Sequence, residues 1–273
     1  KKNFKKIILQ KNFNKKLPLI SVVMNCHNGQ AFLKESIKSL TSQTYKNWEL
    51  IFWDNNSTDK SEEILKQFND RRIKYFKSDS YLKLYRARNL AINQTKGEFV
   101  TFLDTDDLWN NKKLEKQLEI CEKNKNIKFV YSNFFILNQN SNKLFKRSNK
   151  KLASGEITQL LLNDYDIGIL TVMIKKDIFS HYKFDEKYEI IGDFDFFIKL
   201  SQKFKLDCIQ EPLATYRIHD SNFSLKRIDN HVKELEQWMD INHNKLTKSG
   251  YSLIKQKTYL LKLRIKSFFK NLI

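Results

Sequence analysis

An apolar run and an acidic turn meet at residues 99–107, where Phe99-Val100-Thr101-Phe102-Leu103 leads directly into Asp104-Thr105-Asp106-Asp107. The run is hydrophobic on both faces, which is typical of a central parallel strand covered by helices. Carboxylates this close together repel one another, so they need water, basic neighbours or a cation. A hard divalent cation binds carboxylate and diphosphate oxygens, and we therefore expect a metal at this turn. The alternative is a solvated helix N-terminus that Asp106 or Asp107 caps.

The sequence around this turn alternates predicted strands and helices. Strands are expected at 19–24, 48–53, 73–76, 99–103, 128–137 and 169–174, helices at 31–42, 61–68, 84–94, 111–124 and 193–204, and a surface loop at 138–151. This order predicts an α/β fold with an open, Rossmann-like, mostly parallel central sheet flanked by helices. Such sheets bind ligands at the carboxyl ends of their strands. Because Asp54 and Asp104 each follow a strand, we expect them to face one crevice.

Composition limits the class of protein. The chain has 273 residues, of which 41% are hydrophobic and 30% charged, and its six Gly and two Pro leave no long linker. Three scattered cysteines without a CxxC pair indicate neither a disulfide framework nor a zinc cage, so a reducing compartment is expected. The sequence contains no run of 18 or more apolar residues, so no transmembrane helix is predicted.

The net charge of +19 predicts a polyanionic partner. Nucleic acid, an anionic membrane and a phosphate-bearing substrate are the candidates. A genome that favours Lys and Asn codons is the alternative explanation for part of this charge.

Four segments, in order and spacing, give the chain a resemblance to a known family. They are Ser21 to Gly29 (SVVMNCHNG), Gln43-Thr44-Tyr45 with Trp48 to Asp59, Ala87-Arg88-Asn89, and Lys96-Gly97-Glu98 through Asp107. Together they resemble family 2 glycosyltransferases of the GT-A fold, firmly over about the first 110 residues and more loosely to about residue 225. The chain departs from the family at Asn25, where Pro is usual, and at His27, where an aromatic residue is common.

The resemblance implies a nucleotide-sugar site in the first half of the chain. Asp54 would hydrogen-bond the base, and Arg88 would lie near the nucleotide. His27 departs from the family's aromatic residue, but its ring could still stack on a base. Asp104 would approach the ribose or the metal, and Asp106 would ligate Mn²⁺ or Mg²⁺. Such a metal neutralises the charge that develops on a leaving nucleoside diphosphate.

The second half of the chain is expected to supply the catalytic base. The family inverts the anomeric carbon by direct displacement, which needs a group that takes the proton of the acceptor hydroxyl. The matching stretch is Ile191-Gly192-Asp193-Phe194-Asp195, in which Asp193 is the expected base and Asp195 the reserve. Gly192 stands where the family often has a second acid. The alternative role for Asp193 is an N-cap of the next helix.

A closing motif follows this stretch at Tyr216-Arg217-Ile218-His219, with Ser221 and Ser224. His219 is a candidate third metal ligand or phosphate contact. A structural histidine is the alternative.

The resemblance implies transfer of a single sugar, with UDP as the default nucleotide, to a hydroxyl of a glycan or lipid-linked acceptor with inversion. The expected setting is cell-surface polysaccharide or lipopolysaccharide biosynthesis. The QxxRW signature of processive synthases is absent, which favours single addition. A nucleotidyltransferase acting on sugar phosphates is the first alternative, but residues 25–29 lack its Gly-rich basic loop. A nucleic-acid-binding protein is the second, and an acidic crevice would repel its phosphates.

We divide the chain into a basic N-terminal extension at 1–16, a GT-A domain at 17–228 and a basic amphipathic helical tail at 229–273. Within the domain, 17–110 is the nucleotide-binding half and 111–228 the acceptor half. Residues 245–273 read as one helix that interleaves basic and apolar side chains and would lie on an anionic membrane. A helix packed on the body is the alternative. The expected location is cytoplasmic, with peripheral attachment to the inner face of the membrane.

Overall fold

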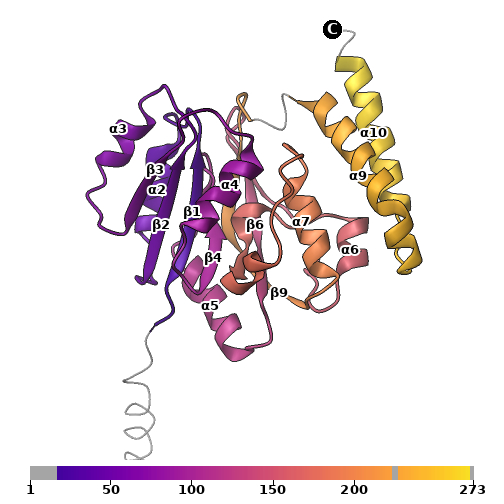
Figure 1. Cartoon of the computed structure of the whole chain (residues 1–273), viewed down its shortest axis with the longest axis horizontal. Coiled ribbons are helices and arrows are strands. Elements are labelled where there is room, and N and C mark those ends of the chain that lie inside the picture. The colour runs from indigo at the N-terminus through magenta and orange to yellow at the C-terminus, as the bar shows by residue number, and fades with distance from the viewer. Residues whose placement is uncertain (1–16, 223–226, 271–273) are drawn as a thin grey trace, which may run out of the picture.

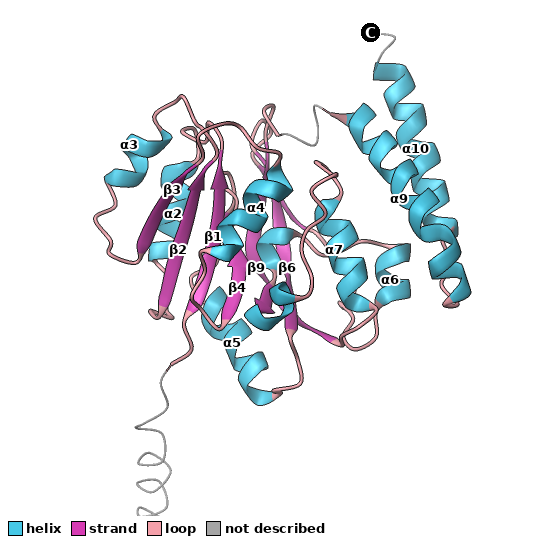
Figure 2. Cartoon of the chain, viewed as in Figure 1, coloured by secondary structure: helices cyan, strands magenta, loops and turns pink. Residues whose placement is uncertain are grey.

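A nine-stranded sheet organises the computed structural model, which describes residues 17–222 and 227–270. Its strand order is β3-β2-β1-β4-β8-β6-β9-β5, and β7 pairs with β6 at its side. The pairs among β3, β2, β1 and β4 are parallel. The remainder is mixed, with one further parallel pair between β6 and β9. Figure 2 shows helices on both sides of this sheet, as the sequence predicts.

The first half of the chain follows the predicted alternation of strand and helix. Its elements are β1 (Ile20–Cys26), α2 (Leu33–Thr41), β2 (Trp48–Asp54), α3 (Ser61–Lys66), β3 (Ile73–Lys77), α4 (Leu84–Asn93), β4 (Phe99–Phe102), β5 (Leu108–Trp109) and α5 (Lys113–Lys123).

The second half departs from the prediction in three places. Its elements are β6 (Phe129–Asn138), β7 (Lys143–Lys146), α6 (Thr158–Asn163), η1 (Ile169–Thr171), β8 (Met173–Lys175), η2 (Lys176–Ser180), α7 (Gly192–Ser201), β9 (Leu206–Ile218), α9 (Ile228–Lys248) and α10 (Ile254–Lys270). The expected loop at 138–151 contains β7, which forms a hairpin with β6. The strand expected at 169–174 begins as a 3-10 turn and becomes β8 only at Met173. The long strand β9 was not predicted.

Two hydrophobic cores lie on opposite faces of the sheet, because successive strand residues point to opposite sides. Val22 and Met24 of β1 belong to the core that includes residues of α2 and α5, whereas Val23 belongs to the core that includes residues of α4 and α7. The strands β1, β2 and β4 are buried on both faces, which explains their continuous hydrophobic sequence.

The C-terminal tail is a hairpin of two helices that packs on the body. The single helix expected at 245–273 is wrong, because α9 ends at Lys248 and is followed by Gly250, whose φ of 83° favours glycine. Leu246, Leu253, Leu260 and Leu263 are all buried in the core that contains α7. Figure 1 places α9 and α10 side by side at the end of the molecule remote from α3.

The predicted extension at 1–16, Ser224 and residues 271–273 lie outside the described residues. Cys26, Cys121 and Cys208 are unpaired, in agreement with the absence of a disulfide framework. Among the described helices, none has the length and apolar character needed to cross a membrane.

Candidate active site

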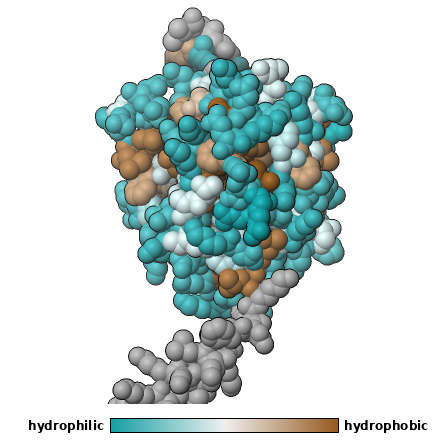
Figure 3. Space-filling model, turned by 90° about the vertical axis from the view of Figure 1, so that its left-hand side faces the viewer, coloured by the Kyte–Doolittle hydropathy of each residue, from teal (hydrophilic) through white to brown (hydrophobic). Residues whose placement is uncertain are grey.

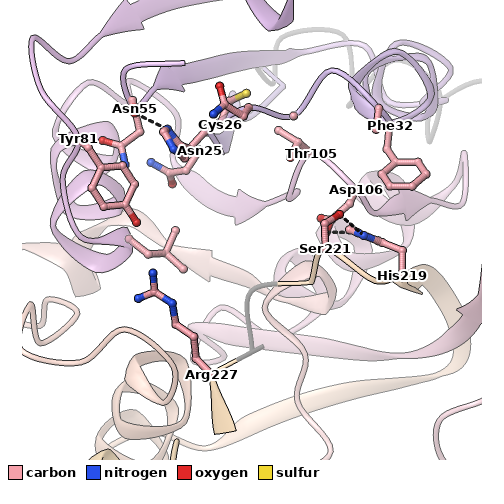
Figure 4. Close-up of a pocket in the computed structure, with 15 residues that line it drawn as sticks. Asn25, Cys26, Phe32, Asn55, Tyr81, Thr105, Asp106, His219, Ser221 and Arg227 are labelled. Carbon is pink, nitrogen blue, oxygen red and sulfur yellow. Dashed lines mark hydrogen bonds and ion pairs between the residues drawn. The ribbon is translucent and has the colours of Figure 1, made fainter. Parts of the chain in front are cut away.

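The carboxyl ends of β1, β2 and β4 meet at a cavity of about 620 Å³ (Figure 4). This volume lies within the range of ligand pockets in proteins. The loop after β1 can approach the acidic turn closely because Gly29 has no side chain, and a Cβ there would lie 3.0 Å from Thr105. Asn28 beside it takes a left-handed φ of 56°, so the predicted Asn28-Gly29 turn is confirmed.

One end of this cavity is polar and aromatic. His27 contacts the Tyr81 ring edge-on at 4.7 Å, and its Nδ1 lies 3.0 Å from the backbone oxygen of Asn55. The side-chain amide of Asn25 is buried in the wall, and neither its oxygen nor its nitrogen has a hydrogen-bond partner among the described residues. Buried polar atoms are rarely left unpaired in native proteins. The amide of Asn25 is therefore available to a planar ligand that presents a donor beside an acceptor.

Asp54 lies beneath this end of the cavity and does not line it. It is fully buried at the end of β2. One carboxylate oxygen accepts the backbone N–H of Ser57 at 2.7 Å, and the other accepts the hydroxyl of Tyr75 at 2.8 Å. Its neighbour Asn55 reaches the cavity instead. Asp54 thus shapes the loop that carries Asn55.

The acidic turn meets the closing motif at the opposite end of the same cavity. His219 Nε2 lies 3.0 Å from Asp106 Oδ2, and His219 Nδ1 lies 2.8 Å from the hydroxyl of Ser221, which orients the ring. A carboxylate and an imidazole that face one cavity form a donor set that suits Mn²⁺. No cluster of three or more His, Cys, Asp or Glu side chains suited to a metal occurs within residues 17–222 and 227–270. A metal held here would need further oxygens, such as those of a diphosphate.

Arg217 anchors the acidic turn from β9. Its Nε donates to the backbone oxygen of Asp106 at 2.9 Å, and its Nη2 pairs with Glu35 of α2 at 2.6 Å. The buried carboxylate of Asp107 accepts the backbone N–H of Arg217 at 3.0 Å. Burial raises the pKa of Asp107 well above its ordinary value, and the neighbouring acids Asp106 and Asp104 add to this. Neither Asp106 nor Asp107 caps α5, so the capping alternative is not observed.

Asp104 lines a second cavity. Arg88 Nη2 of α4 donates to Asp104 Oδ1 at 3.0 Å, and the Arg88 side chain is almost completely buried. Burial raises the pKa of Asp104, whereas the Arg88 guanidinium opposes this. The second cavity, of about 290 Å³, is lined by Asp104 together with Asp193 and Tyr165. The acidic turn therefore presents Asp106 to the larger cavity and both Asp104 and Asp107 to the second one.

Asp193 stands in the first turn of α7 at the wall of the second cavity. Burial raises its pKa to about 6, although the backbone N–H of Phe194 and the charge of Arg88 oppose the shift. The α7 N-terminus does not depend on Asp193 as a cap, since Glu234 of α9 accepts the N–H groups of Glu189, Ile190 and Ile191 at 2.7–3.1 Å.

Asp195, the reserve residue, is occupied elsewhere. Its Oδ1 accepts the indole N–H of Trp238 at 3.0 Å, and its Oδ2 pairs with Lys199 at 2.6 Å. It is buried against α9 and lines neither cavity described above. Of the two acids in this motif, only Asp193 is exposed to a space that can hold a ligand.

The glycine that replaces the expected second acid has a steric cause. A Cβ at Gly192 would lie 2.4–2.6 Å from the ring of Tyr85, which is buried on α4. The Tyr85 hydroxyl in turn lies 3.5 Å from Asp193 Oδ1. In this chain an aromatic ring thus fills the space that a longer side chain would need.

Comparison with known proteins identifies the family to which this site belongs. Residues 21–193 match the family model described as glycosyl transferase family 2. The chain is 35% identical over 216 residues to an uncharacterized glycosyltransferase of Methanocaldococcus jannaschii, covering 77% of this chain and 74% of that protein. It is 32% identical over 226 residues to the UDP-Glc:alpha-D-GlcNAc-diphosphoundecaprenol beta-1,3-glucosyltransferase WfgD of Escherichia coli, covering 82% and 85%.

The fold is similar to that of a solved glycosyltransferase. Residues 1–349 of S. aureus TarS superpose with a TM-score of 0.62 at 17% identity, over 81% of this chain. The chain spans 65% of the length of that TarS structure. A complex of the same TarS fragment with UDP-GlcNAc gives a TM-score of 0.63 at 15% identity, over 81% of this chain and 66% of that one. At these identities the likeness concerns the GT-A fold alone.

Proposed function

Because the chain belongs to glycosyl transferase family 2, we propose that it transfers a single sugar from a UDP-sugar to a hydroxyl of a lipid-linked glycan, with inversion at the anomeric carbon. The observation that carries this proposal is the acidic turn between two cavities, with Asp106 at the larger one and Asp104 facing Asp193 at the other. Membership of this family also decides against a nucleotidyltransferase and a nucleic-acid-binding protein.

The larger cavity takes the nucleotide. Asn25 reads the edge of the base through its free amide, and His27 and Tyr81 flank the ring. Asp54 acts through the loop that it orders rather than by direct contact. Arg88 holds Asp104 at the boundary of the two cavities, where the ribose and the sugar diphosphate would lie.

Asp106 and His219 are the residues that would hold Mn²⁺ or Mg²⁺, with the remaining ligands from the diphosphate. A bound metal would neutralise the charge that develops on the leaving nucleoside diphosphate. Arg217 is the positioning residue that keeps the turn and β9 in register.

Asp193 acts as the general base from the smaller cavity. The acceptor hydroxyl oxygen attacks the anomeric carbon from the face opposite the diphosphate, its proton passes to Asp193, and the bond from the anomeric carbon to the diphosphate oxygen breaks. The raised pKa of about 6 suits this step, because the carboxylate is ionised at neutral pH yet is a stronger base than an exposed aspartate.

We place the enzyme at the inner face of the cytoplasmic membrane, in the synthesis of a cell-surface polysaccharide. Four apolar residues with exposed fractions of 50–70% form one stripe along α10, at the helical spacing i, i+7, i+11 and i+14: Ile254, Leu261, Ile265 and Phe268. Lys257 and Lys262 border the stripe on either side. Apolar anchors between basic rows fit an anionic bilayer. By contrast, apolar residues on the side of α3 and β3 form separate patches within a mostly hydrophilic surface (Figure 3).

Donor hydrolysis and sugar transfer test the proposal directly. The full chain would be incubated with UDP-glucose, UDP-galactose or UDP-GlcNAc, with Mn²⁺, and with undecyl α-D-GlcNAc diphosphate, a short-chain form of the acceptor that the name of WfgD specifies. We expect UDP release that requires Mn²⁺ or Mg²⁺ and is lost in Asp106→Ala. We also expect a β-linked product from the α-linked UDP-sugar. Absence of UDP release with every donor would contradict the proposal.

A further inference from the structure

A third cavity opens beside the proposed base and is not explained by donor binding. It has a volume of about 300 Å³ and lies where α6 and the N-terminal turn of α7 meet α9 and α10. Asp193 lines both this cavity and the smaller cavity described above, as do Arg147 and Tyr165. The base is therefore reached from two sides, and the C-terminal helices α9 and α10 supply part of the second side.

Polar side chains of both signs line this third cavity, the carboxylates of Asp193 and Asp164 and the basic side chains of Lys255, His231 and Arg147. Lys255 of α10 and His231 of α9 both line it, and neither forms a side-chain hydrogen bond or ion pair with another residue of the described part of the chain. The His231 ring lies 5.8 Å from that of Tyr259. The positive charge of Arg147 is already neutralised, because its guanidinium forms ion pairs with Asp166 at 3.1 Å and Asp164 at 3.7 Å. Lys255 and His231 are thus the groups left for a ligand.

Tyr165 adds an unpaired hydroxyl to Lys255 and His231. Its hydroxyl is inaccessible to solvent and has no hydrogen-bond partner among the described residues. The Tyr165 ring packs edge-on against Phe194, the residue next to Asp193, at 5.2 Å. A buried hydroxyl beside the base is suited to bind a hydroxyl of a sugar that enters the cavity.

We propose that this cavity binds the acceptor as a glycosyl phosphate or diphosphate, with its sugar hydroxyls at Asp193 and Tyr165 and its phosphate at Lys255 and His231. The inference rests on the proposed function and adds the acceptor class and the residues that select it. Phosphate oxygens accept hydrogen bonds from an ammonium and an imidazole N–H, and such charge-assisted bonds are strong. The helix that supplies Lys255 also carries the exposed apolar stripe, so a lipid attached to the phosphate can leave the cavity along α10 toward the bilayer.

Direct binding without any donor tests this site. The probe is undecyl α-D-GlcNAc diphosphate, and the comparison ligand is the undecyl glycoside of GlcNAc, which has the same sugar and chain but no phosphate. Titration calorimetry on the full chain should show that Lys255→Gln and His231→Phe each raise the Kd of the diphosphate about tenfold, the loss of one charge-assisted hydrogen bond. The Kd of the glycoside should not change.

Matched controls lie on one of these helices. Lys233→Gln and His243→Phe, both on α9, change exposed or half-exposed side chains outside the cavity and should leave both Kd values as they are. Equal binding of the diphosphate by all four variants, with Mn²⁺-dependent UDP binding intact, would overturn the acceptor site but not the glycosyltransferase. A Kd raised equally in the control variants would overturn it too. Absence of UDP release by the unmodified chain would instead count against the proposed function itself.

Discussion

Asp193 combines burial with chemistry, and the two make opposite demands on its charge. A carboxyl whose folded pKa of about 6 exceeds its ordinary 3.8 is protonated more readily in the folded state. The folded chain therefore loses stability as pH rises from about 4 through 6, by about 3 kcal/mol if the whole shift is realised. Catalysis needs the ionised form, so transfer should fall as pH drops through about 6.

We predict that Asp193→Asn lowers the rate of sugar transfer at least about a hundredfold. It should also remove the pH dependence of stability that this carboxyl contributes. Urea denaturation at pH 4.5 and 7.5 would measure the second effect, with the variant gaining relative to the unmodified chain at the higher pH. Asp195→Asn is the control, because that carboxyl is held by Trp238 and Lys199. It should destabilise the chain yet keep the acid limb of the rate profile. An unchanged acid limb in Asp193→Asn would assign the proton transfer to another group.

Asn25 supports a second prediction at this scale. Its amide is already desolvated and unpaired, so a base that pairs with it gains hydrogen bonds without further desolvation of the protein. We expect Asn25→Ala to raise the Kd of UDP about tenfold in fluorescence or calorimetric titrations. Asn93→Ala, at an exposed position of α4, should have no effect. Equal affinities for UDP in the two variants would remove Asn25 from the base site.

Single residues also mark how far sequence reasoning reaches. The position of Asp104 after a buried strand follows from the alternation of elements. Its ion pair with Arg88, 3.0 Å between Nη2 and Oδ1, is visible only in the structure. In the sequence Asn25 is only a departure from the family pattern, because nothing in a linear sequence shows that an amide lacks partners. The sequence likewise does not show that both carboxylate oxygens of Asp54 accept hydrogen bonds, since one donor, Tyr75, lies on another strand. Hydrogen-bond satisfaction is a property of tertiary structure.

At the scale of elements, α9 holds the helix that carries the proposed base. Glu234 accepts three backbone N–H groups at the start of α7, and Trp238, one turn further along α9, binds Asp195. The negative charge of Glu234 also complements the positive end of the α7 dipole. The tail is therefore part of the framework of the second half rather than an appendage, and we propose that the boundary at 228 separates segments, not independent folding units.

We predict that Glu234→Ala lowers the free energy of unfolding by about 1–2 kcal/mol, the usual value of a helix cap, and lowers transfer more than it weakens UDP binding. Chemical denaturation gives the first quantity, and kcat together with the Kd of UDP gives the second. The control is Glu236→Ala, two residues along the same helix, whose carboxylate pairs with Arg264 at the surface and should contribute little. Equal stability losses in the two variants would show that Glu234 is an ordinary surface acid.

Elements were predictable where their hydrophobic pattern was strong and local. The strands β1, β2 and β4 are continuous apolar runs between clear turns, and the sequence places them within a residue or two. The strand β9 was missed because it contains Pro212 and a register shift against β6, and its burial is irregular. The sequence does not predict the break between α9 and α10, because the basic pattern continues on both sides of Gly250.

At the scale of the whole molecule, one face of α10 is buried against the body and the opposite face is exposed. The buried side of α10, which includes Leu260 and Leu263, packs into the body. Deletion of residues 245–273 would therefore expose the core and is a poor test of membrane binding. The apolar stripe points away from this packing, so its side chains can be changed without loss of the fold.

We predict that Phe268→Asp on the stripe abolishes co-sedimentation of the full chain with vesicles of phosphatidylglycerol and phosphatidylcholine. An aspartate in that position removes an apolar anchor and adds repulsion from the anionic surface. Phe145→Asp on β7 is the matched control, because Phe145 is exposed to a similar degree, 51% against 64%, but belongs to the hairpin with β6. Binding of the unmodified chain should also weaken as salt rises from 0.05 to 0.5 M, since the Debye length then shortens to a few ångströms. Equal sedimentation of the two variants would show that α10 does not face the bilayer, and the lipid of the acceptor would then have to leave its cavity by another side.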